Sequence, residues 1–161
     1  MAEELLIDHT SLSSNVTTNA TANVNGEDSA KGGNINAKYI SRRATLEDGF
    51  DASDIKVILN AYKPLGTNIH LYYKVKADSD PQNFDDKGYV LMEQETPSST
   101  YSGNIEDVKE YVYKTSNEET KYDSASVTYD TFKTFAIKIV MTTDDVTTVP
   151  YVKDARTIAL D

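Results

Sequence analysis

From residue 38 onward, the chain contains several short stretches in which apolar residues recur at every second position. Residues 55–62 read IKVILNAY and residues 69–76 read IHLYYKVK, so each stretch gathers apolar side chains on one face of an extended chain. This alternation is typical of half-buried β-strands. The same reasoning predicts further strands at Tyr39 to Leu46, Tyr89 to Glu93, Val108 to Lys114, Ser126 to Tyr129, Thr134 to Thr142 and Ala155 to Leu160.

The segment between the two clearest strands, Lys63-Pro64-Leu65-Gly66, suits a type I turn. Proline presets the backbone at the second position of such a turn, and glycine is favoured at the fourth. We therefore expect the two strands to form a hairpin. Short strands separated by polar loops predict an all-β fold, an antiparallel two-sheet β-sandwich of jelly-roll-like type. Its predicted core includes Ile55, Val57, Leu59, Ile69, Leu71, Val75, Phe135, Ile137 and Ile139.

Residues 1–36 differ in composition from the rest of the chain. Ser, Thr, Asn, Ala and Gly dominate this segment, and it has no aromatic residue. A segment of this kind buries too little apolar surface to offset the entropy lost on ordering. The sequence therefore predicts an extended interaction arm over residues 1–36, with Gly32-Gly33 as a hinge, and a sandwich domain over residues 37–161. The short apolar stretch Leu5, Leu6 and Ile7 is the expected anchor of the arm on a neighbouring subunit.

The charge of the chain argues against nucleic-acid and membrane partners. With 26 acidic and 16 basic residues, the net charge is -10, which opposes contact with phosphate backbones and anionic lipids. The longest apolar stretch, near residues 135–141, is interrupted by Lys138 and is far shorter than the roughly 20 residues of a membrane span. We expect no nucleic-acid partner and no membrane insertion. The absence of cysteine excludes disulfides and thiolate metal sites.

Residues 47–54 gather four carboxylates in eight residues, enough oxygen ligands to begin a calcium site. The candidate ligands are Asp48, Asp51 and Asp54, but their spacing is not that of an EF-hand loop. Asp and Gly are also common turn residues. We expect the segment to be a turn that Phe50 anchors in the core, with solvated carboxylates and no metal.

The sequence indicates no catalytic constellation. Its two histidines, His9 and His70, lie in no motif that would pair them with a nucleophile. There is no glycine-rich phosphate loop. Paired carboxylates for glycoside hydrolysis depend on a separation in space that the sequence does not fix. We expect no enzymatic activity and no cofactor.

Eleven tyrosines and no tryptophan form the remaining compositional signal. Tyr62, Tyr72, Tyr111 and Tyr113 fall where a strand could point them outward, and tyrosine suits a protein interface or a sugar-binding face. The other interpretation is that tyrosine is a good strand residue whose ring covers part of the core.

Four short motifs resemble a family when taken as a set. They are Asp48-Gly49-Phe50-Asp51, Lys63-Pro64-Leu65-Gly66-Thr67, Phe84-Asp85-Asp86 and Val152-Lys153-Asp154. Together they resemble a β-rich module of virion structural proteins in contractile-tailed bacteriophages, T4-like and cyanobacterial, found in baseplate-associated and other tail proteins. The resemblance spans residues 35–160, and each motif is weak singly. The chain departs from it at Ala155, where a larger apolar residue is more usual, and in the arm, which has no match.

The resemblance implies a structural role and no chemistry. It implies a component of the tail, baseplate or neck, or a decoration protein, assembled in the host cytoplasm and located in the virion. Its partners would be other virion structural proteins, with a homo-oligomer within the particle and the arm docking on neighbouring subunits. The alternative function is a host-surface glycan-binding module of a phage adhesion apparatus, in which tyrosine-bearing loops would contact the sugar.

We predict that the acidic turn is stable without metal. A calcium chelator should leave the melting temperature of the protein unchanged, because a turn that binds no cation loses nothing when cations are removed. A melting temperature that rises with added calcium, as mass action requires of a ligand bound only to the folded state, would contradict this prediction.

Overall fold

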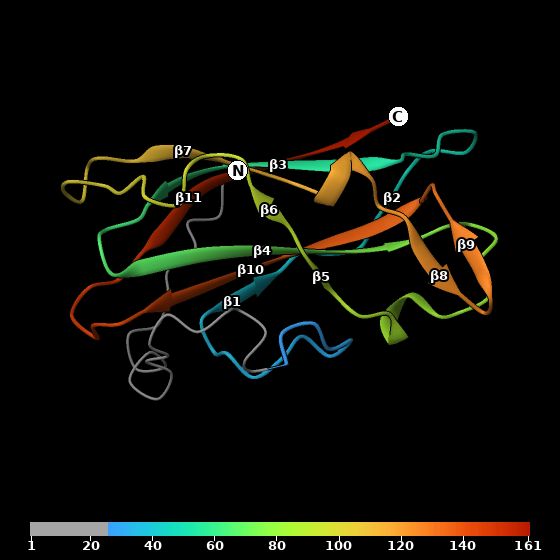
Figure 1. Cartoon of the computed structure of the whole chain (residues 1–161), viewed down its shortest axis with the longest axis horizontal. Helices are drawn as coiled ribbons and strands as arrows, with labels where there is room; N and C mark the ends of the chain where they lie inside the picture. Colours follow the sequence, from blue (N-terminus) through green and yellow to red (C-terminus); the bar gives the residue numbers. More distant parts are fainter. Residues whose placement is uncertain (1–25) are drawn as a thin grey trace.

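The computed structural model describes residues 26–161 and has two layers of antiparallel strands (Figure 1), which confirms the predicted all-β sandwich. Two single-turn 3₁₀ helices, η2 (Phe84–Asp86) and η3 (Ser116–Glu118), are the only helices among these residues, and neither is long enough to cross a membrane. The strands are β1 (Lys38–Ile40), β2 (Ala44–Thr45), β3 (Asp54–Tyr62), β4 (Thr67–Lys76), β5 (Val90–Leu91), β6 (Glu93–Gln94), β7 (Lys109–Lys114), β8 (Tyr122–Ser124), β9 (Val127–Tyr129), β10 (Thr134–Thr143) and β11 (Tyr151–Leu160).

Long strands from distant parts of the chain form the centre of each layer. The first sheet has the order β1-β10-β4-β5, with β2 also paired to β10. The second sheet has the order β11-β3-β7-β6, and β8 and β9 form a separate two-stranded ribbon. Strand β4 pairs with β10 over ten residues, and β3 pairs with β11 over most of its length, with a bulge between Val152 and Asp154.

The hairpin predicted for β3 and β4 is wrong, because these strands lie in different sheets. The turn between them is also one residue later than predicted. The amide of Thr67 donates to the carbonyl of Pro64 at 3.1 Å, and Gly66 has a φ of 85° at the third position. Loop 144–150 joins β10 to β11 across the sheets at the same end, and the amide of Asp144 donates to the carbonyl of Gly66 at 3.0 Å.

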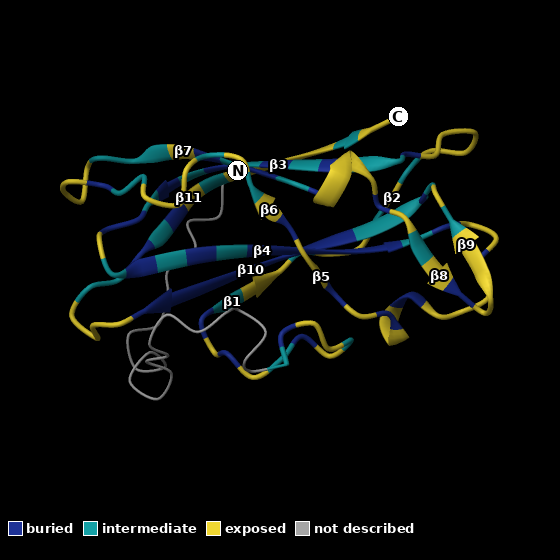
Figure 2. Ribbon diagram, in the orientation of Figure 1, coloured by how far each residue is buried: buried dark blue, intermediate teal, exposed yellow. Residues whose placement is uncertain are grey.

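The core lies between the sheets and consists of the predicted residues together with several tyrosines (Figure 2). Ile55, Val57 and Leu59 of β3 are fully buried, and they face the first sheet. Eight of the nine predicted core residues are buried, and Phe135 is half-buried against the same cluster. The predicted core is therefore confirmed.

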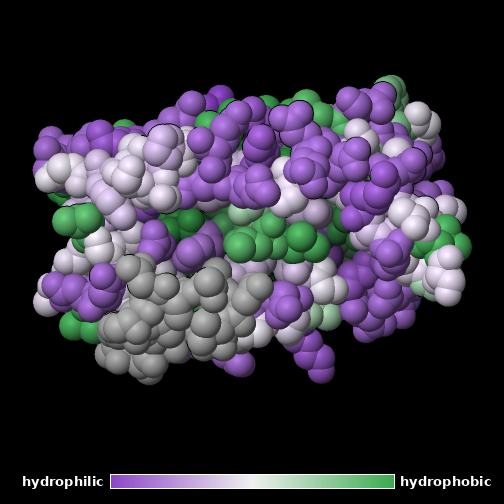
Figure 3. Space-filling view, in the orientation of Figure 1, coloured by the Kyte–Doolittle hydropathy of each residue, from purple (hydrophilic) through white to green (hydrophobic). Residues whose placement is uncertain are grey.

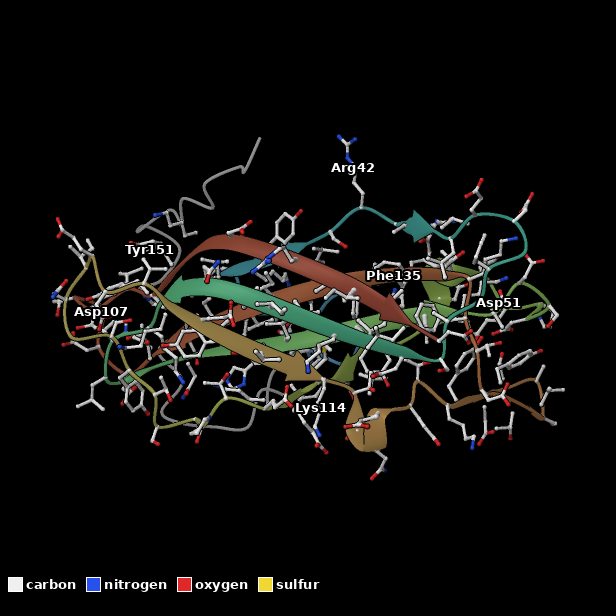
Figure 4. The ribbon with its side chains drawn as sticks, turned by 90° about the horizontal axis from the view of Figure 1, so that it is seen from above. Arg42, Asp51, Asp107, Lys114, Phe135 and Tyr151 are labelled. Carbon is white, nitrogen blue, oxygen red and sulfur yellow. The ribbon has the colours of Figure 1, made fainter. Side chains whose placement is uncertain are left out.

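The two flanks of the sandwich differ. On one flank the chain crosses from the first sheet to the second at the buried Met92, between β5 and β6. Figure 3 shows this closed flank, with an apolar area near the crossing, where Val90 and Leu91 are partly exposed. On the other flank β11 ends the second sheet, and within residues 26–161 no strand pairs with its outer edge (Figure 4).

Residues 26–37 form a strap, the name used below, across the outer face of the first sheet. Glu27 and Ile35 are buried, and the amide of Ile35 donates to Oε1 of Glu27 at 2.8 Å. The amide of Tyr89 donates to the carbonyl of Asp28 at 2.7 Å. Residues 26–36 were predicted as part of the arm but belong to the folded domain. The predicted boundary between arm and domain at residue 36 is therefore wrong for these residues. Residues 1–25 of the predicted arm lie outside the described residues.

We predict that Ile137→Ala lowers the free energy of unfolding by about 2–5 kcal/mol, because it removes buried methyl groups and leaves a cavity. Ile137 is 4% exposed in β10. The matched control is Ile105→Ala at a loop position that is 65% exposed, and it should change the value by less than about 0.5 kcal/mol. Urea denaturation measures both. Equal losses for the two variants would contradict the placement of Ile137 in the core.

Candidate interaction surface

The structure buries most of the tyrosines that were expected to face outward. Tyr111 and Tyr113 are 0% and 2% exposed, because β7 pairs them with Leu59 and Val57, whose side chains face the core. The hydroxyl of Tyr113 donates to the carbonyl of Ile69 at 2.8 Å. The outward orientation predicted for these two tyrosines is therefore wrong, and the interpretation as core residues holds.

Tyr72 does point out of the first sheet, but the strap covers it and its exposure is 0%. Burial raises the pKa of Tyr72, and the nearby carboxylates of Glu27 and Asp28 add to the effect. The prediction that Tyr72 is an accessible contact residue is therefore wrong. Tyr62 is half-buried and packs against Tyr151, with ring centroids 5.4 Å apart. Of the four predicted tyrosines, Tyr62 alone keeps a partly accessible side chain.

Beneath the strap lies a fully buried ion pair. Nζ of Lys138 lies 3.2 Å from Oε2 of Glu27, and both side chains are 0% exposed. The same ammonium donates to the backbone carbonyls of Glu27 and Gly32. It also lies over the rings of Tyr72 and Tyr89, 4.4 and 4.6 Å from their centroids. Burial lowers the pKa of Lys138, and the hydrogen bond and charge of Glu27 oppose that shift.

The path of the strap requires glycine. Gly32 and Gly33 have φ values of 92° and 78°, a region that residues with a side chain rarely adopt. A Cβ atom on Gly33 would collide with the carboxylate of Glu27. The predicted hinge at Gly32-Gly33 is therefore part of a packed turn against the sheet.

A second buried ion pair holds the β8–β9 ribbon to the loop that follows β4. Nζ of Lys87 lies 2.5 Å from Oδ2 of Asp80, and their side chains are 7% and 0% exposed. The hydroxyls of Tyr122 and Ser124 donate to the same carboxylate at 2.8 and 2.9 Å. Burial by itself would raise the pKa of Asp80, but the hydrogen bonds, that from Lys87 foremost, hold it well below its usual range.

A groove of about 610 Å³ lies between the strap, the β1–β2 connection and η2. Four of the five charged residues on its walls have partners for their side chains, and the fifth is Lys31. Arg43 pairs with Asp85 at 3.1 Å, and Nζ of Lys74 donates to the carbonyl of Ala30 at 3.0 Å. Burial lowers the pKa of Lys74. Asp86 accepts a hydrogen bond from Asn83 at 3.2 Å, so these side chains form a structural network.

The acidic turn does not gather its carboxylates around one point. Asp48 pairs with Lys133 at 2.6 Å, and this hydrogen bond lowers the pKa of Asp48. Asp54 accepts from the amide of Ile55 at 2.7 Å. In residues 26–161 no group of three or more potential ligands, Asp51 included, is placed to hold a metal ion.

The anchor predicted for this turn is wrong. Phe50 is 65% exposed and does not enter the core. The segment is fixed two residues later, where Ala52 forms a bridge with Phe132, and both residues are buried. Phe132 in turn packs edge-on against Phe135, with centroids 5.9 Å apart.

The open flank, defined as the outer edge of β11 together with the neighbouring β1, offers a different kind of surface. Register places Ala155 and Thr157 on the core side of the second sheet, yet both are exposed. Tyr39, opposite Ile139, lies on the core side of the first sheet and is 37% exposed. In Figure 4 β11 forms the border of the second sheet, and Arg42 projects away from the molecule on the same side.

The sequence predicted the strand at residues 155–160 but not its position at an edge. The signal that was available is the small size of Ala155, Thr157 and Ala159, at alternate positions. Small side chains on the core side are compatible with an edge that no opposite strand covers. Leu5, Leu6 and Ile7 lie outside the described residues, so their role as an anchor stays a prediction.

Comparison with known proteins gives little further information. No protein-family model and no curated protein matches the chain. Among solved structures, the chain is similar to the protein in "Crystal structure of infectious bursal disease virus VP2 subviral particle", with a TM-score of 0.36 and 10% identity. The match covers 76% of this chain and 32% of that one, so the chain spans about a third of its length. A similarity this weak carries no argument about function.

We predict that Asp80→Asn lowers the free energy of unfolding at pH 7 by about 3 kcal/mol, because it leaves the buried ammonium of Lys87 without its carboxylate. The lowered pKa of Asp80 means that its contribution is fully present above the unfolded pKa, near 4, and is lost as the pH falls toward the folded value. The difference between the variant and the natural chain should therefore narrow below about pH 4.

Asp85→Asn is the matched control for this prediction, since the side chain of Asp85 is 82% exposed in a surface ion pair. We expect it to change stability by less than about 1 kcal/mol at any pH. Urea denaturation from pH 7 to pH 3 measures both variants. A loss for Asp80→Asn that stays constant over this range would show that the carboxylate charge is not the source of its effect.

Proposed function

We propose that the chain is a structural component of a bacteriophage virion, in the tail, baseplate or neck or as a decoration protein, and that it acts by protein–protein assembly. The set of motifs that resembles the phage tail module supports this role. The observation that carries it is the outer edge of β11, a strand of ten residues, with which no strand of residues 26–161 pairs. An edge of this length offers a row of backbone donors and acceptors to a partner, and proteins that remain monomers usually shorten or cover such edges.

The buried polar groups support a structural rather than a chemical role. Lys138 and Lys87, which are the most heavily buried cations with carboxylate partners, hold the strap and the β8–β9 ribbon in place. Each is engaged with a carboxylate and with at least one aromatic ring, so neither is available to a substrate. We infer that the protein is not an enzyme and needs no cofactor.

The partners proposed are other virion structural proteins and further copies of this chain, without nucleic acid. The glycan-binding alternative depended on outward-facing tyrosines. Because Tyr72, Tyr111 and Tyr113 are buried, it loses most of its support.

The proposal is tested on purified particles of the phage that encodes the chain. Mass spectrometry should find the protein in the particle, and a labelled antibody should place it on one substructure. In a complementation assay, a chain lacking residues 1–25 should be absent from particles, while its urea midpoint matches that of the full chain because the strap is retained. A protein that stays in the lysate and is missing from particles would contradict the proposal.

A further inference from the structure

We propose that residues 12–24 of one copy of the chain add as a β-strand to the outer edge of β11 in a neighbouring copy. The inference rests on the proposed assembly function and names the surfaces that would meet. It joins two observations, the alternation of residue types in the segment and the open flank beside β11.

The segment shows a two-residue alternation of polar and mostly apolar residues, in which Ser14 and Thr18 are the two polar exceptions on the apolar side. All odd positions are polar: Ser13, Asn15, Thr17, Asn19, Thr21 and Asn23. The even positions hold apolar or small residues: Leu12, Ser14, Val16, Thr18, Ala20, Ala22 and Val24. Such a pattern gives an extended chain one small apolar face and one polar face. Neither glycine nor proline interrupts it, so every residue of the segment can donate and accept backbone hydrogen bonds.

The edge of β11 presents the complementary features. The carbonyl of Leu160 accepts from the amide of Ser53 at 2.8 Å, on the side of β3. Because successive residues of a strand direct their backbone groups to opposite sides, Ala159, Thr157 and Ala155 direct theirs to the free edge. An added strand can pair with these groups without displacing any strand of the described domain.

The side chains of the open flank leave space for such a strand. An added strand would place every second side chain on the core side, beside Ala155 and Thr157 and above Tyr39 of the first sheet. These positions are exposed although they lie on the core side of their sheets. Alanine and valine from the even positions of the segment would cover them. The odd Asn and Thr residues would face solvent on the outer side of the second sheet, beside the exposed Arg156.

The position where the described chain begins favours a neighbouring copy as the acceptor. The hydrogen bond between Asp28 and Tyr89 places the start of the strap next to β5, on the closed flank. The edge of β11 lies on the opposite flank, about three strand spacings or 14 Å away. Val24 is two residues from Gly26 and reaches only about 7 Å, so the segment cannot lie along β11 of its own copy over its whole length. This limit on reach does not apply to β11 of an adjacent copy, which can lie next to the donating segment.

Each copy would therefore donate a strand at one flank and accept one at the other. A head-to-tail contact of this kind is heterologous, and it generates either a closed ring or an extended fibre. Both forms depend on concentration, which makes self-association of the full chain the direct measurement.

The first experiment compares the self-association of full-length variants by analytical ultracentrifugation. A20D/A22D places two charges on the even face of the segment, and N19D/N23D makes the same change of charge on the odd face. We expect the first pair to weaken association at least tenfold and the second to weaken it less than threefold. Equal effects of the two pairs, or no association of the natural chain at millimolar concentration, would overturn the proposal.

The acceptor edge is tested with Thr157→Pro, which removes an amide directed to the free edge. This variant should lose association at least tenfold while its circular dichroism spectrum stays unchanged. If the proline variant does not fold, Ala155→Lys tests the same edge by placing a charge on the core side of the open flank. Association that survives the folded edge variant would overturn the role of β11.

Cross-linking distinguishes a neighbouring copy from the chain's own edge. The chain has no cysteine, so single-cysteine variants report defined contacts. A mixture of Ala22→Cys and Thr157→Cys chains should form a covalent dimer on mild oxidation, at least tenfold more than a mixture with Asn23→Cys. If a chain carrying both cysteines forms the disulfide within one monomer on oxidation, the proposed exchange of strands between copies is overturned. None of these outcomes alters whether the protein is found in purified particles, so the two proposals fail independently.

Discussion

Lys138 lies in the middle of β10, a ten-residue strand of the first sheet, on the face that points away from the core between the sheets. An uncovered strand would leave this charge in water, at no cost. The strap removes it from water, and a buried charge is tolerated only when it is paired and hydrogen-bonded. Glu27, two backbone carbonyls and two tyrosine rings meet that requirement. Since moving the strap away would leave an uncompensated buried charge, the pair of Lys138 and Glu27 holds the strap at this place on the sheet.

Other lysines also have ammonium groups that lie over tyrosine rings. Nζ of Lys63 donates to the carbonyl of Ser98 at 2.8 Å and lies 4.9 Å from the centroid of the Tyr101 ring. Lys87 lies 4.3 Å from the centroid of Tyr122. An aromatic face attracts a cation while its edges remain apolar, so it can replace part of the hydration shell. Five of the eleven tyrosines lie against lysine ammonium groups in this way: Tyr72, Tyr89, Tyr101, Tyr111 and Tyr122.

Sequence alone predicted the strands and the core because the alternation of apolar and polar residues indicates which side chains are buried. It could not predict how β3 and β4 pair, since Ile55 and Ile69 face the core equally well in a hairpin and in two opposite sheets. It also assigned the wrong face to β7. There Tyr111 and Tyr113 alternate with Val112, so both faces have apolar residues and the pattern does not choose between them. The strap was missed because its burial rests on Glu27, whose partner lies 111 residues away.

The inter-sheet connections next to Gly66 have a consequence for how the polypeptide is made. Val57 in β3 pairs with Thr157 in β11, so its partner leaves the ribosome about a hundred residues later, which at ordinary rates of synthesis is about 5–20 s. Strand β4 must likewise wait for β10. During that interval one edge of β3 and one edge of β4, those that β11 and β10 later cover, stay open to other nascent chains. The order of the strands along the gene thus exposes these two edges for longer than a hairpin of β3 and β4 would.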